Sequence, residues 1–369
     1  MLKKINGNQK NFISKLELLL GERKLIQNSK INIVKKIIRD VRKNGDKALI
    51  KYEKKFSNKK NINSREIKFS KEEVIKEIKK LDKKTKNSID LAFKRIYKFH
   101  VKQKLKPYKL SDNLKNTFSY YSTPINKIGV YVPGGTANYP SSVLMNCIPA
   151  MIAGVKHIYM TSPCIGKKYN PAVIYAAKKC NVEEIYKIGG AQAIAALAYG
   201  TNKIKKVDKI VGPGNKYVAI AKKEVFGDVG IESMIAGPSE VTIVCDKFSN
   251  PEWVASDLIG QAEHDTLAQC ILISKDKYLL DKVKIEIFKQ LKEISRQSIA
   301  KKSLMKNGIL MHINSDKKIV DVVNKIAPEH LELNVKNYKS IVSKIKNSGS
   351  ICLGKYAVMA MTDYNVGSN

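Results

Sequence analysis

The chain has 369 residues, which suggests two or three domains and leaves ample length for a buried core. Hydrophobic residues make up 43% of it, which excludes a disordered composition, and its six cysteines never reach the CxxC spacing of a zinc ribbon or a thioredoxin motif. No apolar run is long enough to span a bilayer, and the basic start lacks an apolar signal segment. We therefore expect a cytoplasmic protein with reduced thiols and no membrane partner.

The formal net charge of +35 invites a nucleic-acid interpretation, but the distribution of the charge argues against it. Residues 1–120 carry 35 of the 68 Lys and Arg against 12 of the 33 Asp and Glu, a net of +23. Residues 121–272 carry 15 basic and 12 acidic residues, a net of only +3. No RNP-like aromatic motif, zinc finger or Arg-rich cluster occurs in the sequence. The excess lysine is expected to be solvated on helical flanks, with no nucleic-acid partner.

Residues 1–118 are predicted to be helical, because apolar residues recur at helical spacing in NFISKLELLL and in INIVKKIIRDVRKNGDKALIKYEKKF. Ser70 and Glu73 in FSKEEV have the spacing of a capping box. This box is expected to begin a long lysine-rich helix that runs toward His100.

The amino-acid composition changes at about residue 119, since 14 of the 21 glycines lie in 121–272. Short apolar runs such as KIGVYVP, HIYMTSP and KIVGPG now alternate with helical patterns, which predicts a parallel sheet with crossover helices. Gly134-Gly135, Gly189-Gly190 and Gly212-Pro213-Gly214 each follow a predicted strand, where parallel sheets bind ligands. None is a GxGxxG fingerprint, so spacing alone signals a dinucleotide only weakly. After AGPSEV the alternation resumes and predicts a second α/β unit.

Three stretches carry candidate chemistry. In LIGQAEHD, Gln261 and His264 stand three residues apart on a predicted helix and could be half of a metal site. Without further evidence, the same two residues could equally be ordinary polar residues at the end of a helix. In APEHLEL, Glu329 and His330 could act as a general acid and a general base, or could be exposed residues of a turn. Near the end, Asp363 in MTDYNVGSN could be a metal donor or a helix cap.

Together these segments closely resemble the histidinol dehydrogenase family, from about Ile31 to Asn369. The resemblance is carried by IGVYVPGGTANYPSSVLMNCIPAMIAGV, GGAQAIAALAYG, VGPGNKYVAIAK, IAGPSEV, GQAEHD, APEHLE and GSICLGKY with TDYNVGSN. The family's zinc enzymes complete histidine biosynthesis by two NAD-dependent oxidations, from L-histidinol through L-histidinal to L-histidine. His100, His157 and His312 lie outside these motifs and are expected to be ordinary histidines.

The resemblance implies a role for each matching residue. Glu329 and His330 correspond to the catalytic acid/base pair, and Gln261, His264 and Asp363 to three zinc ligands. The positions that match the family's other binding residues are Tyr131, Gln192 and Asn215 for NAD, and Ser239 for substrate. The substrate-contacting set also includes His330 and the three zinc ligands.

The resemblance also implies an α/β architecture of two incomplete Rossmann-like domains with parallel sheets, beside the helical N-terminal region. The expected divisions are an N-terminal helical segment at 1–30, a catalytic zinc domain at 31–130 with 241–369, and an inserted NAD domain at 131–240. The family is a homodimer with intertwined terminal segments.

Family members continue beyond the position of Asn369 with a substrate-contacting histidine and a tail. That tail carries a substrate glutamate and a fourth zinc ligand for the partner subunit, none of which the 369 residues contain. The alternatives to an active enzyme are therefore a fragment of a longer protein, a decaying gene product, a short protein with altered function, or a remnant that folds and binds NAD without turnover.

Overall fold

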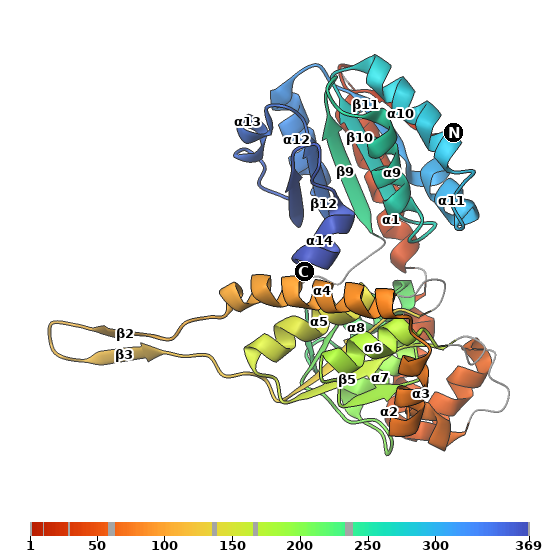
Figure 1. Cartoon of the computed structure of the whole chain (residues 1–369), viewed down its shortest axis with the longest axis vertical. Helices are drawn as coiled ribbons and strands as arrows, with labels where there is room; N and C mark the ends of the chain where they lie inside the picture. Colours follow the sequence, from red (N-terminus) through yellow and green to blue (C-terminus); the bar gives the residue numbers. More distant parts are fainter. Residues whose placement is uncertain are drawn as a thin grey trace. The chain divides into compact units, whose positions relative to one another are not determined.

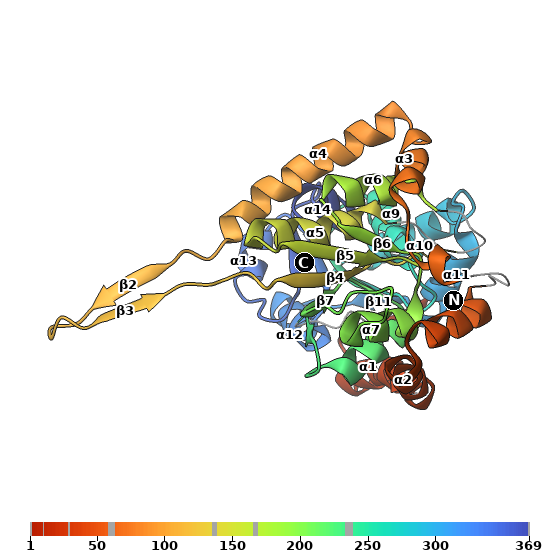
Figure 2. The same ribbon diagram turned by 90° about the horizontal axis from the view of Figure 1, so that it is seen from below.

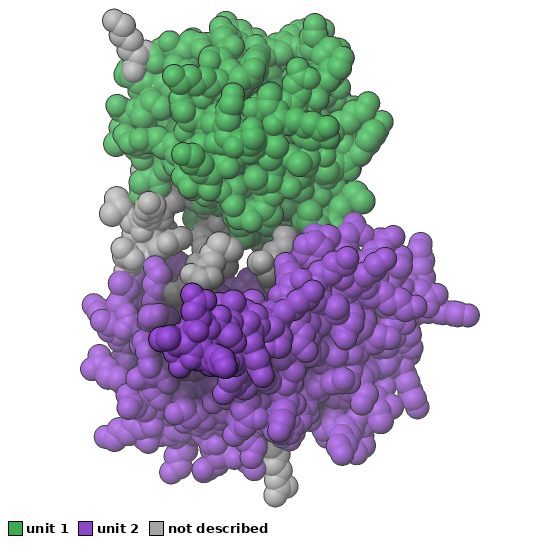
Figure 3. Space-filling model, turned by 90° about the vertical axis from the view of Figure 1, so that its left-hand side faces the viewer, with its two compact units in different colours: residues 1–29, 238–362 green, residues 30–237, 363–369 purple. Residues whose placement is uncertain are grey.

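The computed structural model describes residues 2–9, 11–28, 30–57, 63–134, 139–164, 169–232 and 239–367. The chain divides into two compact units (Figure 3). Unit 1 comprises residues 1–29 and 238–362, and unit 2 comprises residues 30–237 and 363–369. Each unit contains a parallel sheet covered by helices on both faces, which confirms the predicted α/β class. Within the described part of the chain, no helix is long and apolar enough to cross a membrane.

The sheet of unit 1 has the strand order β1-β11-β10-β9-β12-β13, and every pair in it is parallel (Figure 1). Its strands are β1 (Lys3–Asn6), β9 (Glu240–Cys245), β10 (Gln269–Ser274), β11 (Ile309–His312), β12 (His330–Asn334) and β13 (Ser350–Leu353). Its helices are α1 (Phe12–Asn28), α9 (Pro251–Ala262), α10 (Lys277–Gln290), α11 (Gln297–Asn307), α12 (Asp316–Ile326), α13 (Tyr338–Val342) and the start of α14 (Met359–Asn365).

Alternation along the strands decides which face of this sheet each side chain joins. In β9, Ile243 packs into the core beneath α9, α10 and α11, while Val244 packs into the core beneath α1, α12 and α13. In β12, Leu331 and Leu333 join the second core. His330, Glu332 and Asn334 therefore point to the face that α9 covers.

The sheet of unit 2 has the order β6-β5-β4-β7-β8 and is also parallel. Its strands are β4 (Lys127–Tyr131), β5 (His157–Thr161), β6 (Glu184–Tyr186), β7 (Lys209–Val211) and β8 (Gly230–Ile231). Figure 2 shows its two helical layers. One contains α2 (Ile31–Phe56), α7 (Gly190–Tyr199) and α8 (Lys216–Val225), and the other contains α3 (Lys71–Lys79), α4 (Lys83–His100), α5 (Pro140–Ala153) and α6 (Pro171–Lys179). Short 3₁₀ turns lie at Ser64–Ile67 and Val101–Gln103.

The structure corrects the prediction that residues 1–118 are all helical. The segment of β1 is a strand paired with β11, and an antiparallel hairpin of β2 (Tyr108–Ser111) and β3 (Thr117–Tyr120) extends from unit 2 (Figures 1 and 2). The capping box of Ser70 and Glu73 is confirmed, but its helix α3 ends at Lys79. A new helix, α4, begins after Asp82, because the Asp82 carboxylate accepts the N–H of Thr85 at 2.8 Å and favours a helix start there.

The compact units also divide the chain differently from the expected domains. Residues 31–130 fall into the same compact unit as the expected cofactor segment, whereas residues 241–362 belong to the other unit. The reason is the apolar stripe of α2, whose Val34, Ile37 and Val41 share one buried core with Ile194 of α7. Residues 1–29 instead join unit 1 through β1 and α1.

In unit 2 the strand order reverses between β4 and β7, so the loops after these strands flank the position where such sheets bind ligands. The two loops are in close contact. Gly212, just after β7, has φ +105°, and a Cβ there would lie 2.1 Å from the carbonyl oxygen of Tyr131 at the end of β4. Only glycine fits at this point, which explains the first glycine of VGPGN. Gly135 of the preceding loop lies outside the described residues.

Candidate active site

The candidate catalytic residues gather at the amino edge of the unit 1 sheet. Ser239 and Glu329 immediately precede β9 and β12, and His330 is the first residue of β12. Gln261 lies in the last turn of α9, the helix that leads into β10. Because the strands are parallel, their first residues lie along one edge, so residues far apart in sequence come together.

The imidazole of His330 is fixed by hydrogen bonding. Its Nδ1 lies 2.8 Å from the Ser350 hydroxyl, at the start of the neighbouring strand β13. Its Nε2 lies 3.8 Å from Glu329 Oε1, and the other carboxylate oxygen of Glu329 accepts the N–H of Glu240 at 3.1 Å. The side chains of His330 and Glu329 are only 13% and 26% exposed, so the alternative of an exposed turn is wrong.

The backbone also positions this pair. The Ser350 N–H donates to the Glu329 carbonyl oxygen at 2.9 Å. A Cβ on Gly349 would lie 2.6 Å from that same oxygen, so the chain can approach this closely only with glycine at 349. The pair is thus held by its own backbone, by β9 and by β13.

Gln261 and His264 are arranged differently from the expected helical pair. Helix α9 ends at Ala262 with Glu263 as its C-cap, and His264 lies beyond it, its N–H donating to the Gln261 carbonyl at 3.3 Å. Arg296 Nη2 in turn donates to the His264 carbonyl at 3.3 Å.

Two features of these residues suit a divalent metal. The Gln261 side chain is 1% exposed, and its Oε1 has no hydrogen-bond partner among the described residues. Burying an oxygen without a partner costs free energy, and a bound ligand such as a metal ion would remove this cost. Burial lowers the pKa of His264, and the nearby charges of Arg296 and His330 lower it further against an opposing effect of Glu263. The neutral imidazole, which is the metal-binding form, is therefore favoured.

The third expected ligand, Asp363, is partly buried in α14 and belongs to unit 2. In the part of the chain that the structure describes, no group of three or more His, Cys, Asp and Glu side chains is placed to hold a metal. Of the three expected ligands, Gln261 and His264 lie near each other in the chain at the C-terminal end of α9, where histidine would be a common ligand type and a glutamine oxygen a rarer one.

Beneath this site lies a buried carboxyl pair that the sequence analysis missed. Glu332 of β12 is 2% exposed and hydrogen-bonds Asp257, one turn before Gln261 on α9. Burial and the neighbouring Asp257 carboxylate raise the pKa of Glu332 to about 8, while burial raises that of Asp257 to about 6. Glu332 Oε1 also accepts the Met359 N–H at 2.8 Å. The period-two alternation in HLELN could have indicated that Glu332 shares a face with His330.

The expected cofactor residues lie at the carboxyl edge of the unit 2 sheet. The Tyr131 hydroxyl accepts the Gly190 N–H at 3.0 Å, and Gln192 follows two residues later in α7. Asn215 follows β7, and its side chain accepts the N–H groups of Tyr217 and Val218 as the N-cap of α8. Ser239 precedes β9 in unit 1, and its carbonyl oxygen accepts the Gln269 N–H at 3.0 Å.

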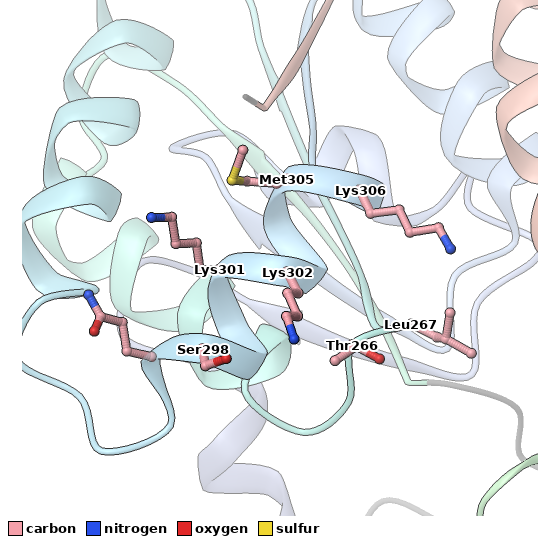
Figure 4. A pocket seen from close by; sticks show the side chains of 8 residues that line it. Thr266, Leu267, Ser298, Lys301, Lys302, Met305 and Lys306 are labelled. Atoms are coloured by element: carbon pink, nitrogen blue, oxygen red, sulfur yellow. The ribbon is translucent and has the colours of Figure 1, made fainter.

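A separate depression of about 900 Å³ lies on unit 1 where α11 meets the turn after His264 (Figure 4). Lys301, Lys302 and Lys306 of α11 line it, with Thr266 and Leu267 of the turn. None of the residues singled out from the sequence is among its lining residues. Surface lysines alone do not define a binding site, and the candidate chemistry lies at the sheet edge instead.

The carboxyl pair predicts how stability depends on pH. The folded state keeps a proton on Glu332 that the unfolded chain, with its ordinary pKa of 4.5, has released at neutral pH. Folded molecules thus bind more protons than unfolded ones between about pH 5 and 8, so stability falls as pH rises through this window. In Glu332→Gln this decline should be shallower, and the free energy of unfolding at pH 8 should exceed that of the wild type. Urea unfolding of both proteins at pH 5, 6.5 and 8 measures this free energy.

Asp257→Asn provides the matched variant, because it removes the other member of the pair. It should flatten the same decline. If both variants kept the wild-type dependence on pH, the raised pKa of the pair would be disproved.

The chain is similar to known proteins along nearly its whole length. The family model for histidinol dehydrogenase matches residues 22–369. The chain is 64% identical over 370 residues to the histidinol dehydrogenase of Pelagibacter ubique, covering all of this chain and 85% of that protein. It is 39% identical over 368 residues to that of Hydrogenovibrio crunogenus, with the same coverage. The crystal structure of histidinol dehydrogenase from Elizabethkingia anophelis matches with a TM-score of 0.88 and 34% identity, over all of this chain and 84% of that one. The chain therefore belongs to the histidinol dehydrogenase family.

Proposed function

We propose that this chain is an NAD- and zinc-dependent oxidoreductase that converts L-histidinol through L-histidinal to L-histidine, the last step of histidine biosynthesis. Family membership supports this activity. The observation that carries it is the His330 imidazole, anchored by Ser350 on one nitrogen and facing the Glu329 carboxylate with the other. Oxidation of an alcohol needs a general base that can take the hydroxyl proton, and histidine is the side chain that most often acts as one.

His330 acts first. Since Ser350 engages Nδ1, Nε2 is the nitrogen that accepts the hydroxyl proton of the alcohol. The carbinol hydride leaves at the same time for NAD, which supplies the oxidising power when bound. Glu329 then takes a proton from the water that adds to the aldehyde, while His330 returns its proton to the aldehyde oxygen, which gives the hydrate. His330, neutral again, accepts a hydroxyl proton of the hydrate as the second hydride leaves for a second NAD, and the product is the carboxylic acid.

In this proposal Gln261, His264 and Asp363 hold the zinc, which orients the imidazole and amino groups of the substrate. Ser239 contacts the substrate as well. Tyr131, Gln192 and Asn215 contact NAD at the carboxyl edge of the unit 2 sheet. We place the enzyme in the cytoplasm, where its six buried cysteines stay reduced.

The first experiment measures NADH formation from L-histidinol with zinc present. It is run on the 369 residues and on the same chain joined to the C-terminal segment of the Pelagibacter ubique relative, of which this chain covers 85%. His330→Asn should lower kcat by about 10²–10⁴-fold, the usual contribution of a general base. His312→Asn changes a histidine at the carboxyl end of β11, the opposite edge of the sheet from His330, and should leave kcat unchanged. Lack of turnover in both folded forms, with NAD and zinc bound, would disprove the proposed reaction.

Zinc binding tests Gln261 independently of activity. Gln261→Leu removes the unpartnered oxygen while keeping most of the side-chain volume, so the metal-free protein should become more stable. Its affinity for zinc should fall at least about tenfold, the range seen when the residues around a bound metal are altered. Zinc titration followed by elemental analysis measures this. Gln192→Leu, also a buried glutamine but in unit 2, is the matched control and should bind zinc as the wild type does. Equal zinc affinity in Gln261→Leu and the wild type would exclude Gln261 as a ligand.

We further propose a homodimer, and the β2–β3 hairpin supports it. Leu110 pairs with Phe118 and Tyr108 with Tyr120, which gives the hairpin one apolar face. Leu110 and Phe118 are 61% and 60% exposed, and an isolated two-stranded hairpin is marginally stable in water. Exposed apolar surface of this kind marks an interaction site, which a second copy of the chain would cover.

Leu110→Glu with Phe118→Glu should raise the dimer dissociation constant at least about 100-fold, because two apolar anchors are lost. Sedimentation velocity at several protein concentrations measures it. Lys109→Glu with Ser119→Glu changes the other face of the same strands and should leave the dimer intact. A dimer of unchanged affinity in the first variant would exclude the hairpin from the interface.

A further inference from the structure

A buried carboxylate lies at the start of α7, next to the residues proposed to contact NAD. Glu53, near the end of α2, is 0% exposed. Its Oε1 accepts the Gly189 N–H at 3.1 Å and the Gln192 side-chain NH₂ at 2.9 Å. Its Oε2 accepts the hydroxyl of Ser57 at 2.7 Å. Three hydrogen bonds from neutral donors thus hold one carboxylate inside the protein.

The position of Glu53 is explained partly by the helix that it meets. Helix α7 begins at Gly190, its N-cap is Gly189, and it has neither a capping side chain nor an acidic residue in its first turn. The first N–H groups of a helix need acceptors and carry partial positive charge. Glu53 takes the Gly189 N–H, and the Tyr131 hydroxyl takes the next one, that of Gly190. A helix distant in sequence therefore supplies the cap.

Capping alone does not explain the bond to Gln192. A carboxylate can only accept, so the NH₂ group of Gln192 must face Glu53. The amide can then turn only one way, with its carbonyl oxygen available as an acceptor for a bound molecule. Gln192 is itself only 3% exposed, so a wrongly turned amide would leave buried polar groups unpaired.

We propose that Glu53 is a positioning residue for the cofactor: it fixes Gln192 and the Gly189–Gly190 turn in the geometry that binds the dinucleotide. This inference rests on the proposed function and adds a residue of α2 to the cofactor site. It also indicates which chemical groups of NAD this position can bind. The α7 N-terminus already holds a carboxylate, so it does not bind a phosphate of the cofactor. Gln192 presents an acceptor instead, which suits a hydroxyl or amide group of NAD.

The test is NAD affinity, measured by titration of the zinc-loaded protein. Glu53→Leu has similar volume but no acceptor, and the dissociation constant for NAD should rise at least about tenfold, or 1.4 kcal/mol. Glu53→Gln keeps an oxygen toward Gly189 and Gln192 and can donate to Ser57, so it should retain NAD affinity within about threefold. In steady state, Glu53→Leu should raise KM for NAD more than it lowers kcat, with KM for histidinol unchanged.

Asp40→Asn is the matched control on the same helix. Asp40 also accepts three hydrogen bonds, from Asn44, Lys51 and Tyr52, and none of these three bonds involves a residue of the α7 turn. This variant should lose stability and keep its NAD affinity, as a purely structural role of α2 requires.

Glu53→Asp covers the case in which Glu53→Leu does not fold, because it keeps the charge but withdraws the carboxylate by one methylene. It should also bind NAD at least about tenfold more weakly. Wild-type NAD affinity in folded Glu53→Leu or Glu53→Asp would overturn the proposal. A wild-type protein that binds no NAD at all would instead disprove the proposed function, so the two failures are distinguishable.

Discussion

Parallel pairing of the strands is the constraint on which both candidate sites depend. When all strands run the same way, every strand begins at one edge of the sheet and ends at the other. Beyond the added edge strand β1, the order β11-β10-β9-β12-β13 in unit 1 repeats β6-β5-β4-β7-β8 in unit 2, and each order reverses once beside its first strand. Unit 2 has its candidate cofactor residues at the carboxyl edge, as open α/β sheets usually do. Unit 1 has its candidate catalytic pair at the amino edge, so the two candidate sites lie at opposite edges of sheets with the same strand order.

The alternation of side chains along β12 determines which face of the unit 1 sheet carries the polar residues. Leu331 and Leu333 are buried in the core under α12, so His330 and Glu332 must face α9. That face therefore carries two layers of polar groups: the imidazole beside Glu329 at the edge, and the Glu332–Asp257 pair deeper in. Buried polar groups are costly unless they are paired, and the shared proton keeps one of these two carboxyls neutral. The deeper pair thus places one negative charge, and not two, beneath the residues above it.

The sequence pointed to the residues of the candidate site that stand in compact motifs and missed those that distant elements supply. Glu329, His330, Gln261 and His264 could be identified because each motif keeps its residues together. Ser350 could not, because its role arises only when β13 pairs with β12. The α/β class followed from the alternation of apolar runs, whereas the four-residue strand β1 is too short to show a period. The domain boundary differed because an amphipathic pattern shows that α2 has an apolar stripe but not which core receives it.

The most conspicuous feature of the sequence, its charge of +35, has little to do with these sites. Ion pairs such as Lys51–Asp40 and Lys80–Glu77 involve lysines more than half exposed, and such pairs contribute little in water. The charged groups that shape the sites are carboxylates shielded from solvent, and their partners are backbone N–H groups, an amide, a hydroxyl or one another. Even Lys222, which is 2% exposed, is bound internally by Glu232 and the Gly212 carbonyl oxygen in the loop after β7. The interactions that set the geometry of the candidate sites are buried. The charges of surface lysines are screened by solvent and salt, so additional surface lysines have little effect on these sites.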